Sequence, residues 1–108
     1  MLDLTLIKQQ IRMPVEFTDE DDLLRLYRDA ARDFLVTDLN RPIYDDEADV
    51  PADDDGRALV INARLSAAEL MLIGHFYENR EAVVTGTISS EVHLGVERLV
   101  GPFRFYGV

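Results

Sequence analysis

The sequence holds few residues whose types and spacing suit chemistry, and the first are His75 and Glu78. They lie three residues apart, which places two side chains on one face of a helix and suits a pair of metal ligands. The other histidine, His93, falls in a different predicted element, near the start of the last helix. We therefore interpret His75 as a structural histidine within an interface, and we expect neither a metal nor a cofactor.

The second chemical candidate is an acidic segment in the middle of the chain. Its carboxylates are Asp45, Asp46, Glu47, Asp49, Asp53, Asp54 and Asp55. The fragment Asp53-x-Asp55-Gly56 resembles part of a calcium loop, but Pro51 stands where the first ligand should sit and Asn62 where the closing glutamate belongs. Crowded like charges favour an exposed loop instead, so no calcium site is expected.

The composition and the missing motifs argue against several other functional classes. There is no cysteine, no Gly-x-Ser-x-Gly motif and no phosphate loop, so we predict that the protein is not an enzyme. The net charge of −10 argues against a protein that grips DNA, although it suits a surface that DNA slides past. Without a signal peptide or a run of about 20 apolar residues, we expect a protein made in a cytoplasm, with no membrane partner.

The helix that must position His75 is the element around which the rest is organised. Ser66 and Glu69 form a predicted capping box that starts it. The residues that follow are apolar nearly all round, which is typical of a helix surrounded by other elements. Gly74 lies in its middle, and we interpret it as room for a second helix or a neighbouring chain to approach closely.

Three further helices are predicted around this one. Their expected limits are Asp3 or Thr5 to Pro14, Thr18 to Asn40, and Ser89 or Ser90 to Pro102. Lys8 and Arg32 are placed on the polar faces of the first two. Short β elements are expected at Ala58 to Ile61 and at Val83 to Ile88. The prediction is a mostly α, four-helix small domain that spans residues 1–108, with a long acidic loop.

Two stretches of the chain resemble a known family. GHFYENREAVVTG, followed by LGVERLVGPFR, is similar to the C-terminal half of the head–tail connector (adaptor) proteins of long-tailed phages. The match is closest at His75, Tyr77, Glu78, Asn79, Arg80 and Glu81. Family members often carry Leu-Pro where this chain has Val92-His93. In the N-terminal half the general plan agrees, with a short helix and then a longer one that starts acidic and ends in Arg-Pro.

The resemblance implies a structural virion protein of the head–tail junction, made in the cytoplasm of a bacterial host. It implies a ring of about twelve copies beneath the portal. The implied partners are the portal protein, a head-completion, stopper or tail protein, and genomic DNA that passes without sequence-specific binding. Candidate residues for the subunit or portal interface are His75, Tyr77, Glu78, Asn79, Arg80, Phe103, Arg104, Phe105 and Tyr106. Candidates that face the channel are Asp45, Asp46, Glu47, Asp53, Asp54, Asp55, Thr85, Gly86 and Thr87.

Several alternatives stay open at this point. The aromatic C-terminal tail either folds back onto the core or docks on another chain, and the resemblance favours docking. Glu78 and Arg80 pair either within their own chain, with residues such as Arg32 or Asp33 of the second helix, or across the subunit boundary, where Arg80 would meet a carboxylate of the next subunit. The acidic loop faces either the channel or the outer surface. The rival function is a small acidic adaptor or regulatory module that binds one cellular protein.

Overall fold

The computed structural model describes residues 1–81 and 88–106. Its helices are α1 (Leu4–Gln10), α2 (Asp21–Leu39), α3 (Ala63–Glu78) and α5 (Ser90–Val100), with short 3-10 turns at Glu47–Asp49 and Gly101–Phe103. The strands are β1 (Ile43–Tyr44) and β2 (Leu59–Val60). The predicted mostly α, four-helix fold with a long acidic loop is confirmed, and β2 is the strand expected at residues 58–61. The β element expected at residues 83–88 lies, except for Ile88, outside the described residues.

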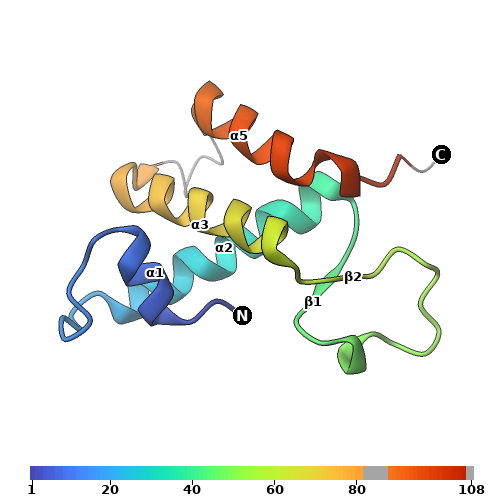
Figure 1. The fold of residues 1–108 in the computed structure, drawn as a ribbon, viewed down its shortest axis with the longest axis horizontal. Helices are drawn as coiled ribbons and strands as arrows, with labels where there is room; N and C mark the ends of the chain where they lie inside the picture. The colour runs from blue at the N-terminus through green and yellow to red at the C-terminus, as the bar shows by residue number, and fades with distance from the viewer. Residues whose placement is uncertain (82–87, 107–108) are drawn as a thin grey trace.

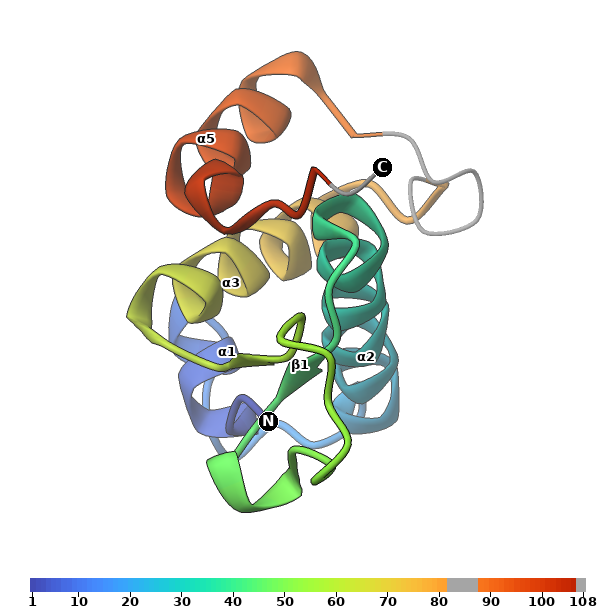
Figure 2. The ribbon, with the colours of Figure 1, turned by 90° about the vertical axis from the view of Figure 1, so that its right-hand side faces the viewer.

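The central helix is α3, as the sequence predicted. It lies between α2 and α5, and α1 packs against both α2 and α3 (Figures 1 and 2). Leu65, Leu72 and Ile73 of α3 are fully buried, and Leu24 and Leu35 of α2 meet them in one core. Burial on this scale is what holds short helices in place, because helices of this length are marginal alone in water.

Two predicted helix starts are wrong. α3 begins at Ala63, where the side chain of Asn62 accepts a hydrogen bond from the Leu65 amide at 3.0 Å. Ser66 is therefore inside the helix, and Glu69 points into the core instead of back to an amide. α2 begins at Asp21 and not at Thr18, with no side-chain cap.

Other helix ends agree with the sequence. Asp3 and Ser89 cap α1 and α5 by accepting from the amides two and three residues ahead. Asn40 ends α2 in the left-handed conformation, with φ of 57°. These signals succeed because each depends only on residues that are neighbours in the chain.

The acidic loop is closed at its base by a two-residue parallel pairing of β1 and β2. Ile43 faces Leu59 and Tyr44 faces Val60 in the register. The Leu59 amide donates to the Pro42 carbonyl at 2.8 Å, and Ile43 and Leu59 are both buried. The loop thus leaves and rejoins the helical body at one point.

The close helix approach expected at Gly74 occurs elsewhere within this chain. The nearest atom to a Cβ placed on Gly74 is the Nε2 of Gln10, at 3.9 Å, which is an ordinary contact. The tight approach is at Gly95, where α5 crosses α3 and the methyl end of Met71 fills the space of the missing side chain. A neighbouring chain at Gly74 stays a prediction.

Candidate functional site

The end of α3 carries five of the predicted interface residues. Asn79 is the C-cap of the helix, and its side-chain amide donates to the His75 carbonyl at 3.2 Å and lies 3.4 Å from the His75 ring Nδ1. His75 is half-buried and Glu78 is exposed. In the described part of the chain, no group of three potential ligands is placed to hold a metal ion. His75 therefore contacts the C-cap residue of its own helix.

Tyr77 and Arg80 meet the start of α2. Burial raises the pKa of the Tyr77 phenol, and the neighbouring Glu20 carboxylate raises it further. Glu20 Oε1 also lies 3.6 Å from Arg80 Nη2, although most of the Arg80 side chain is in solvent. The partner of Arg80 within the chain is thus Glu20, not Asp33 or Arg32. A 3.6 Å exposed pair is weak, so it leaves Arg80 available to a neighbour.

Residues 11–20 form the turn that joins α1 to α2. The side chain of Lys8 is buried beneath this turn, so its predicted place on the polar face of α1 is wrong. Lys8 is only 3% exposed, and its ammonium donates to the carbonyls of Phe17 at 2.7 Å and Val15 at 3.1 Å. It also pairs with Asp21 at 2.8 Å. The ammonium thus donates two hydrogen bonds to backbone carbonyls and has a carboxylate as its ion-pair partner. Lys8 is therefore what fixes the shape of the turn.

Beside this turn the surface is hollowed. The hollow has a volume of about 340 Å³ and is open to solvent. It is lined by Ile11, Arg12, Met13, Pro14, Phe17 and Tyr77. Of these six residues, only Tyr77 was predicted as a site residue. The signal in the sequence is the group of apolar residues Met13, Val15 and Phe17, in a segment too short for a helix.

A buried ion pair links α2, α3 and the base of the acidic loop. Arg32 Nε donates to Glu69 Oε2 at 2.6 Å, and Arg32 Nη2 donates to Asp45 Oδ1 at 2.9 Å. Glu69 is 1% exposed, and Arg32 is buried instead of lying on the polar face that was predicted. The Met1 amino group lies 2.8 Å from the same Asp45 oxygen. Asp45, a channel candidate, is thus already engaged within the chain.

The pKa values of this network follow from its geometry. Burial alone would lower the pKa of Arg32, but the hydrogen bonds to Glu69 and Asp45 raise it above its ordinary value. The hydrogen bond from the Met1 amino group is the largest cause that holds the pKa of Asp45 below its ordinary value; burial opposes it, and Arg32 lowers the pKa further. Arg32 and Asp45 are therefore both charged at neutral pH.

The remaining channel candidates of the acidic loop are exposed, and several carboxylates support backbone turns. Asp46 accepts from the Ala48 amide at 3.0 Å. Asp54 accepts from Gly56 at 3.0 Å and Ala58 at 3.2 Å, and Asp55 accepts from Arg57 at 3.2 Å. Glu47 and Asp53 lie in solvent. The loop is thus an exposed acidic surface with an internally bonded backbone, while Thr85, Gly86 and Thr87 lie outside the described residues.

The C-terminal tail, residues 103–106, folds back as far as Phe105. The Phe105 amide donates to the Leu39 carbonyl at 2.9 Å, and the Arg57 guanidinium stacks 4.0 Å from the Phe105 ring centre. Arg41 Nη1 donates to the Phe103 carbonyl at 3.1 Å. Tyr106, by contrast, is 80% exposed. The base of the tail thus folds back onto the helical body, which is one of the two predicted alternatives, and docking of the tail on another chain stays a prediction.

Arg104 is the strongest anchor of the tail. It pairs with Asp38 at 2.6 Å and with Glu97 at 2.7 Å, so it joins α2 to α5. The hydrogen bond to Glu97 is the largest cause that raises the pKa of Arg104. The same contact holds the pKa of Glu97 below its ordinary value. A predicted interface residue thus has a structural role within the chain.

The similarity of this chain to known proteins lies in its sequence. No helix in the described ranges, 1–81 and 88–106, is long and apolar enough to cross a membrane. No solved structure matches the chain significantly. The chain is 34% identical over 87 residues to the head completion protein gp6 of Enterobacteria phage HK97, a match that covers 76% of this chain and 75% of that protein. Residues 1–104 match the family described as phage gp6-like head-tail connector protein, and the chain therefore belongs to that family.

Proposed function

We propose that this chain forms a ring beneath the portal of a phage head, extends the DNA channel and joins the head to the neck or tail. The observation that carries the proposal is the family match over residues 1–104, which includes every described element. As a member of that family, the chain is a structural component of the virion at the head–tail junction. A ring of about twelve copies would use one kind of contact repeated around an axis.

In this ring the acidic loop is proposed to line the channel. The exposed carboxylates of Asp46, Glu47, Asp53, Asp54 and Asp55 support this, because negative charge along a channel repels the phosphates of passing DNA. The genome would then pass without strong or sequence-specific binding. Asp45 contributes less to this surface, since Arg32 already neutralises it. Thr85, Gly86 and Thr87 are proposed to face the same channel.

The portal contact is proposed for the tail. Its base is held against α2 by Arg104, while the Tyr106 side chain projects into solvent. An aromatic side chain kept in water on an anchored segment suits an interface anchor. The end of α3, with His75, Tyr77, Glu78, Asn79 and Arg80, is proposed for contact between subunits.

The test is the native mass of the purified chain, alone and after mixing with the portal protein of the same phage. We expect a ring-sized mass in at least one sample. A monomer that joins only the portal would show that the portal templates the ring. A monomer that ignores the portal would contradict the proposal and favour a small acidic adaptor that binds one cellular protein.

Tyr106→Ser tests the role of the tail in the same assay. We expect it to weaken portal binding, because it removes an exposed aromatic group. Leu94→Ser is the matched control, since Leu94 is an exposed apolar residue in the middle of α5. Equal portal binding by both variants would remove the tail from the proposal.

A further inference from the structure

One side of α3 is open to solvent although its residues are small or apolar. The inward side of the helix is buried, as at Leu65, Leu72 and Phe76. On the opposite side every third or fourth residue is half-buried or exposed, and these residues, which we call the outer face of α3, are Ala63, Ala67, Leu70 and Gly74. A helix that is apolar on its outer side as well is typical of one surrounded by other elements.

The helix α1 extends this open surface. Gln10 Nε2 is the nearest atom to a Cβ placed on Gly74, at 3.9 Å. Leu6 lies one turn before Gln10 on the same side of α1, and it is 42% exposed although it is a large apolar residue. The surface formed by these residues and the outer face of α3 is uncharged, so it can lose its water at little electrostatic cost.

Charge restricts where two copies of this chain can meet. With a net charge of −10 they repel one another, so they approach closely only where charge is low or where opposite charges meet. Within α1 and α3 the exposed charged side chains are Arg64 and Glu78, at the two ends of α3. Of the charged residues that flank α1, Asp3 caps the helix and Arg12 lies past its end. In the described part of the chain no carboxylate pairs with Arg64.

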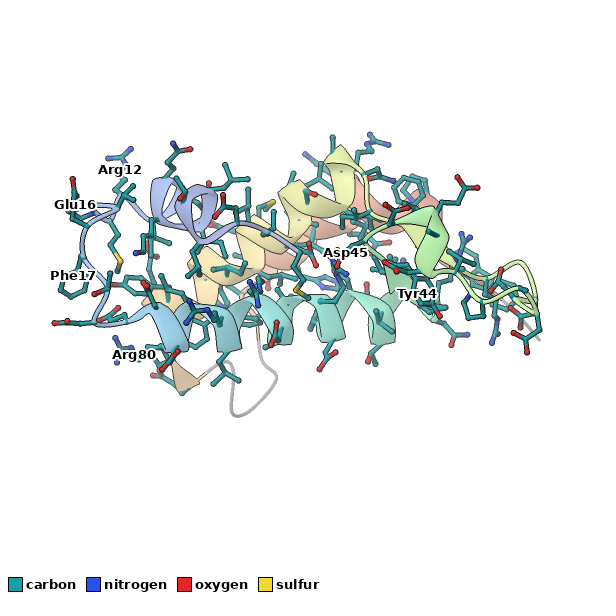
Figure 3. The ribbon with its side chains drawn as sticks, turned by 90° about the horizontal axis from the view of Figure 1, so that it is seen from below. Arg12, Glu16, Phe17, Tyr44, Asp45 and Arg80 are labelled. Carbon is teal, nitrogen blue, oxygen red and sulfur yellow. The ribbon has the colours of Figure 1, made fainter. Side chains whose placement is uncertain are left out.

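The opposite side of the molecule is formed by α2 (Figures 2 and 3). Leu26 is 56% exposed there, more than any other large apolar residue within a described helix. The residues on its side of the helix, which we call the outer face of α2, are Leu26, Ala30, Asp33 and Thr37. Among residues 1–81 and 88–106, no cation pairs with the exposed Asp33. Two other exposed carboxylates of α2 already have partners on the same helix, in the pairs Asp22–Arg25 and Asp29–Arg28.

The antiparallel course of α2 and α3 decides which of their residues lie level. Glu69 in α3 accepts from Arg32 in α2. Arg80, just past the end of α3, lies beside Glu20, just before the start of α2. Counted from these contacts, the two outer faces match to about one residue in the pairs Leu26 with Gly74, Ala30 with Leu70, Asp33 with Ala67, and Thr37 with Ala63. Arg64 is thus within about one turn of the level of Asp33.

The shape of the chain favours contact between these two faces. The chain measures 42 × 32 × 22 Å, and α2 lies on one side of its shortest axis with α1 and α3 on the other (Figures 2 and 3). Copies stacked on these faces repeat at roughly 22–30 Å, so about twelve of them form a circle on the order of 100 Å across. When the longest axis lies along the radius, the acidic loop at one end of that axis points into an opening of roughly 50 Å, which duplex DNA can pass (Figure 1).

We infer that the outer face of α2 in one copy packs on the outer face of α3 in the next copy of this chain. The inference rests on the proposed ring and names the contact that builds it. Neighbours in a closed ring of about twelve differ by a turn of about 30° and by no shift along the ring axis, so residues level within one chain stay level between neighbours. Leu26 then enters the space that Gly74 leaves beside Leu6. The Arg64 guanidinium reaches the unpaired Asp33 carboxylate. Each copy offers one face of each kind, so the contact is heterologous and can close.

Paired cysteines test the contact directly, because the natural chain has no cysteine. We would make Thr37→Cys with Ala63→Cys in one full-length chain, at two exposed positions that are level with each other. Within one chain the two faces point away from each other, and a disulfide requires Cα atoms within about 7 Å, so any bond must join different copies. The control carries Thr37→Cys with Leu94→Cys, which is exposed on α5 outside both faces. Both are oxidised mildly, with the portal present if the natural chain needs it to form a ring.

A covalent ladder that ends at the ring size, in the Ala63 variant and not in the control, would support the inference. Equal ladders, or none in either variant while the natural chain still shows a ring-sized mass, would overturn the inference and leave the proposed function intact. If the natural chain forms no ring alone or with the portal, the proposed function itself fails and the inference falls with it.

A charge exchange gives a second, independent reading. Arg64→Glu is expected to lose the ring-sized mass, because it places a carboxylate against Asp33. Arg64→Glu combined with Asp33→Arg is expected to recover the ring at least in part. Arg98→Glu is the control, since it makes the same change of charge at an exposed position on α5. All three positions are exposed, so thermal unfolding should change little and loss of assembly can be separated from loss of folding. A natural ring in Arg64→Glu, or an equal loss in Arg98→Glu, would contradict the inference.

Discussion

The turn between α1 and α2 and the acidic loop between α2 and α3 are both irregular, but different cations hold them. The turn is held from below by Lys8, whose compact ammonium gathers two carbonyls and a carboxylate. The loop is held at its base by Arg32 and Arg41, which reach separate segments. A guanidinium suits that task because its planar fork donates in several directions.

The difference determines what each segment presents to solvent. Around Lys8 the polar backbone of the turn faces inward, so apolar side chains face outward. Around the arginines the backbone of the loop is bonded inward as well, but its own carboxylates satisfy many of the remaining amides and leave an acidic exterior. The turn therefore exposes Val15 and Phe17 among polar side chains, whereas the loop exposes mainly carboxylates.

The largest expected effect is at Arg32. Arg32→Met leaves the Glu69 carboxylate buried without its partner, and it should lower the free energy of unfolding by about 3–5 kcal/mol, measured with urea. Arg32→Met combined with Glu69→Leu should recover most of this loss, because the pair is replaced by apolar packing. Arg25→Met is the control, since its pair with Asp22 is exposed and worth under about 1 kcal/mol.

A substitution at Lys8 tests the turn between α1 and α2, the other region of the comparison. Lys8→Met leaves two carbonyls and a carboxylate without their donor and should cost about 1–3 kcal/mol of unfolding free energy. Since the turn lies beside Tyr77, which is proposed for contact between subunits, a turn that loses its shape should also weaken assembly. If Lys8→Met assembled normally, the turn would not be part of the subunit contact.

A smaller effect is expected from Arg104, through pH. Arg104 lowers the pKa of Glu97 in the folded chain, so Glu97 adds stability above its unfolded pKa and loses it as pH falls through the folded value. Arg104→Gln should remove this contribution. The decline of the unfolding free energy between about pH 5 and pH 3 should therefore be shallower in the variant. Arg98→Gln, an exposed change on the same helix, should keep the natural slope.

The smallest expected effect is at Gly74, away from both regions. Gly74→Ala should raise the free energy of unfolding by about 0.5–1 kcal/mol, because alanine loses less entropy in a helix and its methyl group meets only Gln10 at ordinary distance. Thermal unfolding measures this. If stability rises while the ring mass disappears, a neighbouring chain approaches at Gly74 after all.

The sequence predicted the elements better than it predicted the environment of their charges. Asn40 and Ser89 mark helix ends through local geometry, and the apolar run of α3 identified the central helix, so these parts could be read in advance. The burial of Lys8 and Arg32 could not be predicted, because a buried charge is recognised only by the partners that surround it. Glu69 is 37 positions from Arg32 in the chain, a separation that no helical spacing rule covers.

The candidate site likewise has parts that the sequence predicted and parts that it did not. The family motif around Tyr77 and Arg80 was visible in the sequence, whereas the hollow beside them required α1, the turn and α3 to be brought together. Likewise the aromatic tail was recognised, but its base is fixed by Asp38 and Leu39, which lie more than sixty positions earlier. Sites made by one segment are predictable, and sites made where segments meet are not.

The crossing of α3 and α5 at Gly95 has a consequence for oxidative damage. The chain has three methionines and no cysteine, so thioethers are its main targets for peroxide. Met71 is half-buried and its methyl end lies in the space above Gly95, so oxidation would place a polar sulfoxide in an apolar contact. Met1, exposed at the chain start, should oxidise without harm. Peroxide treatment is therefore expected to loosen α5 from α3 once Met71 reacts, which would separate the helix that anchors the tail from the rest of the protein.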